Sequence, residues 1–157
     1  MNVHDLINSF ESNFRAYYQL LNKLNEGNIS YIPNDSSWNI RDLLEMLADL
    51  EDEIIDYRLK KILEEEHPYL PQIRMERIRQ NRIYRNFPLS RLINHILQQR
   101  RSFLQLLYTL PPEKWERTGV HELEGHIPFK EFVRRMIEKD QEILSQLSQA
   151  LAPQHIK

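Results

Sequence analysis

Cysteine is absent from this sequence of 157 residues, and glycine occurs only three times. The lack of cysteine excludes disulfides, thiolate metal sites and a cysteine nucleophile. Scarce glycine favours helices, because glycine is costly in a helix interior, whereas the many Leu, Ile, Glu, Gln and Arg residues suit one. We therefore expect an all-α protein.

Long hydrophobic runs and a strong charge of either sign are also missing. The apolar stretches are far shorter than the roughly 20 residues that cross a bilayer. Residues 1–5 have no basic region followed by an apolar one. The net charge of -2 offers no global attraction to nucleic acid or anionic lipid. We expect a cytoplasmic protein that has no membrane span and does not bind nucleic acid.

Apolar residues recur in steps of three and four along four segments, as they do in the helices of bundles. These segments cover residues 3–24, 40–57, 89–110 and 129–151. Amphipathic helices of this kind bury their stripes against one another. The sequence therefore predicts a four-helix bundle formed by a single domain over residues 1–157.

The links between the predicted helices differ in length. Asp35, Ser36 and Ser37 offer capping oxygens at the end of the first link. Residues 68–87 form the longest link, which permits a crossover, and a short helix is expected within it at Met75–Arg82. The third link is expected to be a loop, and no segment shows the period-two pattern of a strand.

Five segments of the chain match, in order and spacing, those of a known protein family. The second predicted helix reads Trp38-Asn-Ile-Arg-Asp-Leu-Leu-Glu-Met-Leu-Ala-Asp-Leu-Glu51, and the fourth contains Lys139-Asp-Gln-Glu-Ile143. The other three segments are residues 69–84, 100–103 and 110–129. Together they resemble the DinB/YfiT-like superfamily, which includes metal-dependent enzymes. The resemblance implies an up-down-down-up bundle with a long crossover between helices two and three.

Members of that superfamily usually carry three histidines that bind a divalent metal, in a His-Leu-Ala-Asp and a His-Asp-x-x-His motif. Histidines at i and i+4 share a helix face and can reach one ion together. The matching positions here are Met46, Lys139 and Ile143. An isoleucine donates no lone pair, a methionine offers only a soft thioether, and a lysine is a cation at neutral pH. We therefore expect neither a bound metal nor a cofactor.

The resemblance also places a residual pocket, with no catalytic residue, at these positions. Its predicted lining is Met46, Asp49, Gln99, Lys139 and Ile143. Two interpretations of the lysine are open. Its ammonium either takes the place of the cation and pairs with Asp49 or Asp140, or it extends to solvent above a packed stem.

Two classes of function follow. The favoured one is a non-catalytic protein that binds a small molecule or a partner and that we expect to form a homodimer. The alternative is a metal-dependent enzyme of the DinB/YfiT type, a thiol-dependent S-transferase or a hydrolase, with ligands relocated to His95, Asp49 and Asp140. A metal-independent enzyme that uses Lys139 with Asp140 is a further variant of this alternative.

Two other patterns are less specific. Carboxylates crowd residues 42–56, and eight arginines lie within residues 74–101. A basic strip with aromatic residues could bind nucleic acid, but pairing with the acidic helix, within the chain or across a dimer, explains both runs. His121-Glu122 and His126 resemble a zincin motif with one residue too many. We interpret that match as accidental.

Overall fold

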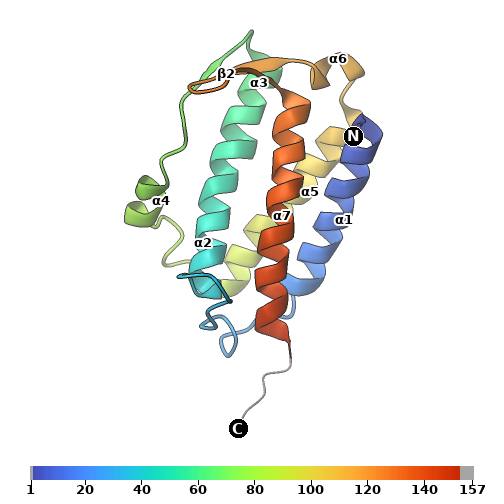
Figure 1. The fold of residues 1–157 in the computed structure, drawn as a ribbon. Helices are drawn as coiled ribbons and strands as arrows, with labels where there is room; N and C mark the ends of the chain where they lie inside the picture. The colour runs from blue at the N-terminus through green and yellow to red at the C-terminus, as the bar shows by residue number, and fades with distance from the viewer. Residues whose placement is uncertain (1, 153–157) are drawn as a thin grey trace.

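Four long helices pack side by side in the computed structural model, which describes residues 2–152 (Figure 1). Helix α1 and helix α7 run in one direction, and the helix that begins with α2 runs with α5 in the other. This arrangement confirms the predicted bundle and its up-down-down-up order. The bounds are α1 Val3–Leu21, α2 Ile40–Glu51, α5 Leu89–Thr109 and α7 Phe129–Leu151.

The second long helix changes its hydrogen-bonding pattern midway. After α2 it continues as a π-helical segment, η1, at Asp52–Leu59, and then as α3 at Lys60–Glu64. The first turn of α2 is capped by the Asn39 side chain, which accepts a hydrogen bond of 2.8 Å from the Asp42 amide. The cap expected among residues 35–37 is therefore wrong.

The long link contains the predicted short helix, α4, at Met75–Asn81. Figure 1 shows it beside α2, and arginines of this link pair with carboxylates of α2. Arg77 bonds to Asp49 Oδ1 at 3.2 Å, and Arg82 contacts Asp42 and Glu45 at 2.7 and 2.9 Å. Pairing within the chain thus accounts for part of the basic and acidic runs.

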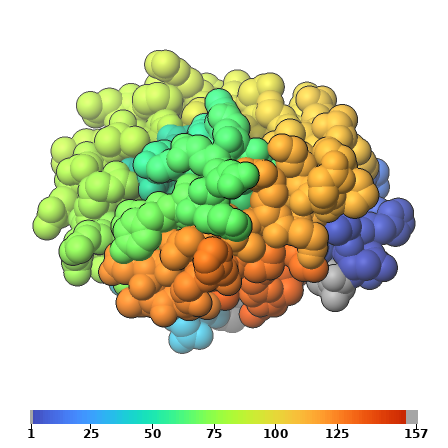
Figure 2. All heavy atoms as spheres, turned by 90° about the horizontal axis from the view of Figure 1, so that it is seen from above, coloured from blue at the N-terminus to red at the C-terminus, as the bar shows by residue number. Residues whose placement is uncertain are grey.

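Three short strands close one end of the bundle, contrary to the expected loop. Strand β1 (Tyr69–Leu70) pairs in parallel with β2 (Thr118–His121), and β2 pairs antiparallel with β3 (Gly125–Pro128). The short helix α6 (Pro112–Trp115) precedes β2. Figure 2 shows this end covered by the segment after α3, which lies against the β2–β3 hairpin. The strands are too short for a period-two pattern to stand out in the sequence.

The core consists of two apolar clusters with a buried ionic group between them along the helices. One cluster includes Tyr17, Leu47 and Leu147, and the other includes Phe10 and Phe129. None of the helices within residues 2–152 combines the length and apolar character needed to span a membrane.

Candidate functional site

The ionic group in the bundle core joins three of the four long helices. The Arg100 side chain, 1% exposed, donates to Glu51 Oε1 at 2.9 Å and to Asp140 Oδ1 and Oδ2 at 2.6 and 2.9 Å. The Tyr17 hydroxyl and the Asn13 amide also donate to Asp140, at 2.9 and 3.1 Å. Burial raises the pKa of Glu51, and Arg100 offsets part of that rise. Asp140 thus has all its acceptor capacity occupied by protein groups.

A cavity of about 320 Å³ lies between the second long helix and α7, next to this ionic group. Its walls are mainly apolar, and the ionic group contributes Glu51, Arg100 and Asp140 to its lining. Three further cations line it, and each has an acidic partner. Arg58 pairs with Glu53 at 3.2 Å, Arg135 with Glu124 at 2.7 Å, and Lys139 with Glu142 at 3.2 Å. The apolar lining residues include Leu47, Leu50, Ile54, Phe132, Met136 and Ile143.

Two of the five predicted pocket residues, Lys139 and Ile143, line this cavity, and the other three lie elsewhere. Met46 is partly buried at the edge of an apolar cluster. Asp49 turns toward Arg77, and its Oδ2 is buried without a hydrogen-bond partner among residues 2–152. Gln99 lines a different hollow. The resemblance therefore gave two residues of the cavity lining and misplaced the other three.

The Lys139 ammonium does not take the place of a cation in the core. Its side chain is 56% exposed and pairs with Glu142 on the same helix. Arg100 occupies Asp140, and Arg77 bonds to Asp49. Of the two interpretations, the pair between Lys139 and one of these aspartates is therefore wrong, and the structure agrees with the other, in which the lysine extends to solvent.

The residues at the family's metal position do not fit a divalent ion. Ile143 is buried in an apolar cluster at 3% exposure, and the ammonium beside it points outward. The relocated set is not assembled either, because His95 contacts Asp52 and Tyr84 rather than Asp49 or Asp140. Within residues 2–152 no group of three or more His, Cys, Asp or Glu side chains could hold a metal.

The histidines that superficially suggested a zincin lie in the β2–β3 region instead of on a helix. His121 Nδ1 accepts hydrogen bonds from the backbone amides of Leu123 and Glu124, at 3.1 and 3.2 Å. His126 Nδ1 lies 3.0 Å from the Thr118 hydroxyl. A hairpin cannot present the two histidines as the helical motif does, so the interpretation of the match as accidental agrees with the structure.

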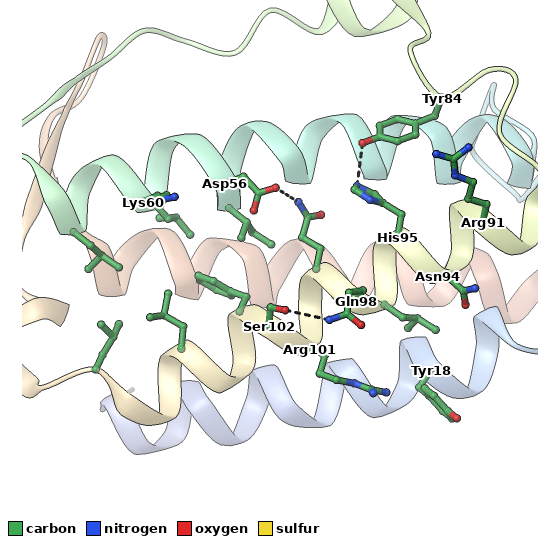
Figure 3. Close-up of a pocket in the computed structure, with 18 of the residues that line it drawn as sticks. Tyr18, Asp56, Lys60, Tyr84, Arg91, Asn94, His95, Gln98, Arg101 and Ser102 are labelled. Atoms are coloured by element: carbon green, nitrogen blue, oxygen red, sulfur yellow. Dashed lines mark hydrogen bonds between the residues drawn. The ribbon is translucent and has the colours of Figure 1, made fainter.

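A second and larger hollow, a groove of about 1310 Å³, lies between η1–α3, α5 and α1 (Figure 3). A polar cluster lies in it. Tyr84 donates its hydroxyl proton to Asp52 Oδ2, and Gln99 Nε2 donates to Asp52 and Asp56 at 2.9 Å each. Burial and the bond to Asp52 raise the pKa of Tyr84. Sequence reasoning missed this cluster, because the π-helical segment changes which residues of the second helix share a face.

The fold and the cavity together define a class: an up-down-down-up four-helix bundle with a small apolar cavity between its second and fourth long helices. The model of the DinB superfamily matches residues 9–142. The chain therefore belongs to the DinB superfamily.

Two relatives illustrate the similarity. A protein of Oceanobacillus iheyensis named "Putative metal-dependent hydrolase OB0413" is 24% identical over 152 residues, which are 96% of this chain and 86% of the relative. The structure of YfiT from Bacillus subtilis, described as a probable metal-dependent hydrolase with an unusual four-helix bundle topology, aligns with a TM-score of 0.78 at 15% identity. That alignment covers 94% of this chain and 85% of YfiT, and it supports the fold.

Proposed function

We propose that this DinB-superfamily protein binds a small molecule in the cavity between α2 and α7, without a metal and without catalysing a reaction. The observation that carries the proposal is the chemical character of the side chains at the family's metal position. Two of them, Lys139 and Ile143, line the cavity, one as an outward ammonium and the other as a buried alkyl group. Neither supplies a lone pair to an ion.

The charged groups of the cavity also favour binding over catalysis. Glu51 and Asp140 are both held by Arg100. Lys139 is more than half exposed, so it lacks the desolvated surroundings that turn a lysine into a base or nucleophile. What remains for a ligand is the apolar wall.

The size of the cavity indicates the size of the ligand. Its volume of about 320 Å³ is roughly twice the 150 Å³ of an engineered apolar cavity that binds benzene. A molecule with two fused rings, or an alkyl chain of similar volume, would fill it.

The single domain, the homodimer and the cytoplasmic location stay predictions.

Binding of naphthalene-type probes tests the proposal. We expect the fluorescent probe 1-anilinonaphthalene-8-sulfonate to bind the folded protein and naphthalene to displace it. Leu50 is partly exposed and lines the cavity, so Leu50→Trp should fill the space and weaken binding at least tenfold.

The control is Leu123→Trp, because Leu123 is 67% exposed on the hairpin and is not part of the cavity lining. This variant should bind the probe as the unmodified protein does. Equal binding by the unmodified protein and the Leu50→Trp variant would contradict the proposal. Dependence of binding on added zinc or nickel would instead support the metal-dependent alternative.

A further inference from the structure

The groove beside α5 contains a histidine whose two ring nitrogens have different surroundings. His95 Nε2 lies 2.9 Å from Asp52 Oδ1 and 3.0 Å from the Tyr84 hydroxyl oxygen. Its Nδ1 has no hydrogen-bond partner among residues 2–152. The side chain is 33% exposed and lines the groove. Figure 3 shows Tyr84 and His95 pointing toward each other. Arg91 lies nearby on α5, the helix that carries His95.

Asp52 determines which nitrogen of His95 carries the proton. An ionised carboxylate only accepts hydrogen bonds, and the Tyr84 hydroxyl donates its one proton to Asp52 Oδ2. Nε2 must therefore carry a hydrogen, since otherwise it would face two acceptors with no proton between them. A neutral imidazole has one donor and one acceptor nitrogen. In the neutral form of His95, Nδ1 is consequently a free acceptor at the groove surface.

The orientation of the ring is fixed from two sides. Asp52 is the first residue of η1, and it also accepts a hydrogen bond of 2.9 Å from Gln99, one turn after His95 on α5. The Tyr84 and His95 rings pack with their centroids 5.1 Å apart. Asp52, Tyr84 and Gln99 are thus positioning residues for the imidazole. π-Helical segments are frequent at functional sites, and here one carries the carboxylate that selects the tautomer.

The groove around His95 is suited to an aromatic ligand. Phe87, Phe103 and Leu106 line it, and so does Arg91, whose guanidinium lies 4.4 Å from the centre of the Phe87 ring. A ligand for the free Nδ1 has to donate a hydrogen bond. A thiol is a weak donor, whereas an aromatic hydroxyl, with a pKa of about 10 as in tyrosine, is a stronger one. A cation such as Arg91 would also favour partial negative charge on its oxygen.

We propose that this groove is a second ligand site, which binds a small aromatic hydroxyl compound through a hydrogen bond from its O–H to His95 Nδ1. The site is separate from the cavity between α2 and α7, since His95 is not part of the lining of that cavity. Its failure would leave the cavity proposal unaffected, and the reverse also holds.

Two measurements on the unmodified protein test the inference. Nitrogen-15 NMR of the imidazole should show the neutral Nε2–H tautomer for His95, and either the Nδ1–H tautomer or the doubly protonated imidazolium would overturn the assignment. Phenol and anisole should then be titrated while the His95 signal is followed. Anisole carries a methyl group in place of the hydroxyl hydrogen of phenol, so it cannot donate a hydrogen bond. Phenol should therefore bind roughly fivefold to tenfold more tightly, which corresponds to the net stabilisation by one hydrogen bond.

A pair of variants locates the effect. His95→Phe keeps a ring in the groove and removes Nδ1, so the preference for phenol should disappear. In His4→Phe the preference should be unchanged, because His4 lies on α1 and contacts Asn8. Circular dichroism checks that both variants fold. Anisole binding as tightly as phenol in the unmodified protein, or a preference for phenol that survives in His95→Phe, would overturn the proposal.

Discussion

The two hollows on either side of η1 differ in how their polar groups are satisfied. In the cavity toward α7, each charged lining side chain has an intramolecular partner, and the free surface is apolar. In the groove toward α5, His95 keeps an accessible nitrogen with no partner among the described residues. The position where the superfamily usually binds its ion therefore offers mainly packing, whereas the opposite face of the same helix offers hydrogen bonding.

The largest loss of stability is expected when the cation of the ionic group next to the cavity is removed. Arg100→Met leaves two buried carboxylates without their cation, so it should destabilise the protein by about 3–5 kcal/mol. Urea unfolding followed by circular dichroism measures the loss. The neighbouring exposed Arg101 provides a matched control, and Arg101→Met should change stability by less than about 0.5 kcal/mol. Equal effects would mean that the group does not stabilise the core.

The second prediction concerns a variant that adds metal ligands beside the cavity. The double variant Lys139→His and Ile143→His places two imidazoles at i and i+4 beside the cavity. Zinc should stabilise this variant by about 2.7 kcal/mol at a concentration a hundredfold above its Kd. The unmodified protein should not respond. Thermal unfolding with and without zinc separates the two, and an equal shift in both would contradict the comparison.

A smaller effect is expected in the groove. Tyr84→Phe removes the hydroxyl that donates to Asp52, and it should cost about 1 kcal/mol of stability, the usual value of one such bond. Tyr108→Phe removes a hydroxyl that donates to Glu11 on an exposed tyrosine, so it is a control for burial, and we expect it to cost less. Denaturant unfolding gives both values, and a larger loss in Tyr108→Phe would show that the cluster at Asp52 adds no stability.

The smallest prediction concerns pH and a surface network at the rim of the cavity, which Arg135 also lines. Hydrogen bonds from Arg134 and Arg135 outweigh partial burial and lower the pKa of Glu131 from 4.5 to about 2. Because the folded-state pKa is lowered, the contribution of Glu131 is present above pH 4.5 and is lost as pH falls toward 2. Glu131→Gln should cost less than about 1 kcal/mol at neutral pH.

Unfolding curves of this variant and of the unmodified protein across the acid range measure that difference. The two curves should converge as the pH approaches 2. A difference that stays constant over the whole range would show that ionisation of Glu131 is not its source.

The sequence predicted the bundle well, because the apolar repeats at residues 3–24, 89–110 and 129–151 follow simple helical spacing. The resemblance supplied the order of the helices, which periodicity alone does not determine. The three strands were missed, since β1 has only two residues and its partner β2 lies some fifty positions away in the chain. Pairing of that kind leaves no local signal.

The site was predicted less completely. Met46 was placed in the pocket by its match to the family motif, and Asp49 by its position one turn from Met46, but neither lines the cavity. Arg100 was recognised as part of a basic run and of a segment that resembles the family, but not as a core residue, because nothing in the sequence shows that it meets Glu51 and Asp140 inside the bundle. The role of His95 depends on η1, and a π-helical segment leaves no clear mark in a sequence pattern.

The central claim is that the superfamily's metal position no longer binds an ion in this protein. Native mass spectrometry of protein purified without chelator, from cells grown with added zinc, tests it most directly. We predict that the folded chain appears at the mass of the metal-free polypeptide. A species heavier by one tightly held zinc ion per chain, lost only on unfolding, would contradict the claim.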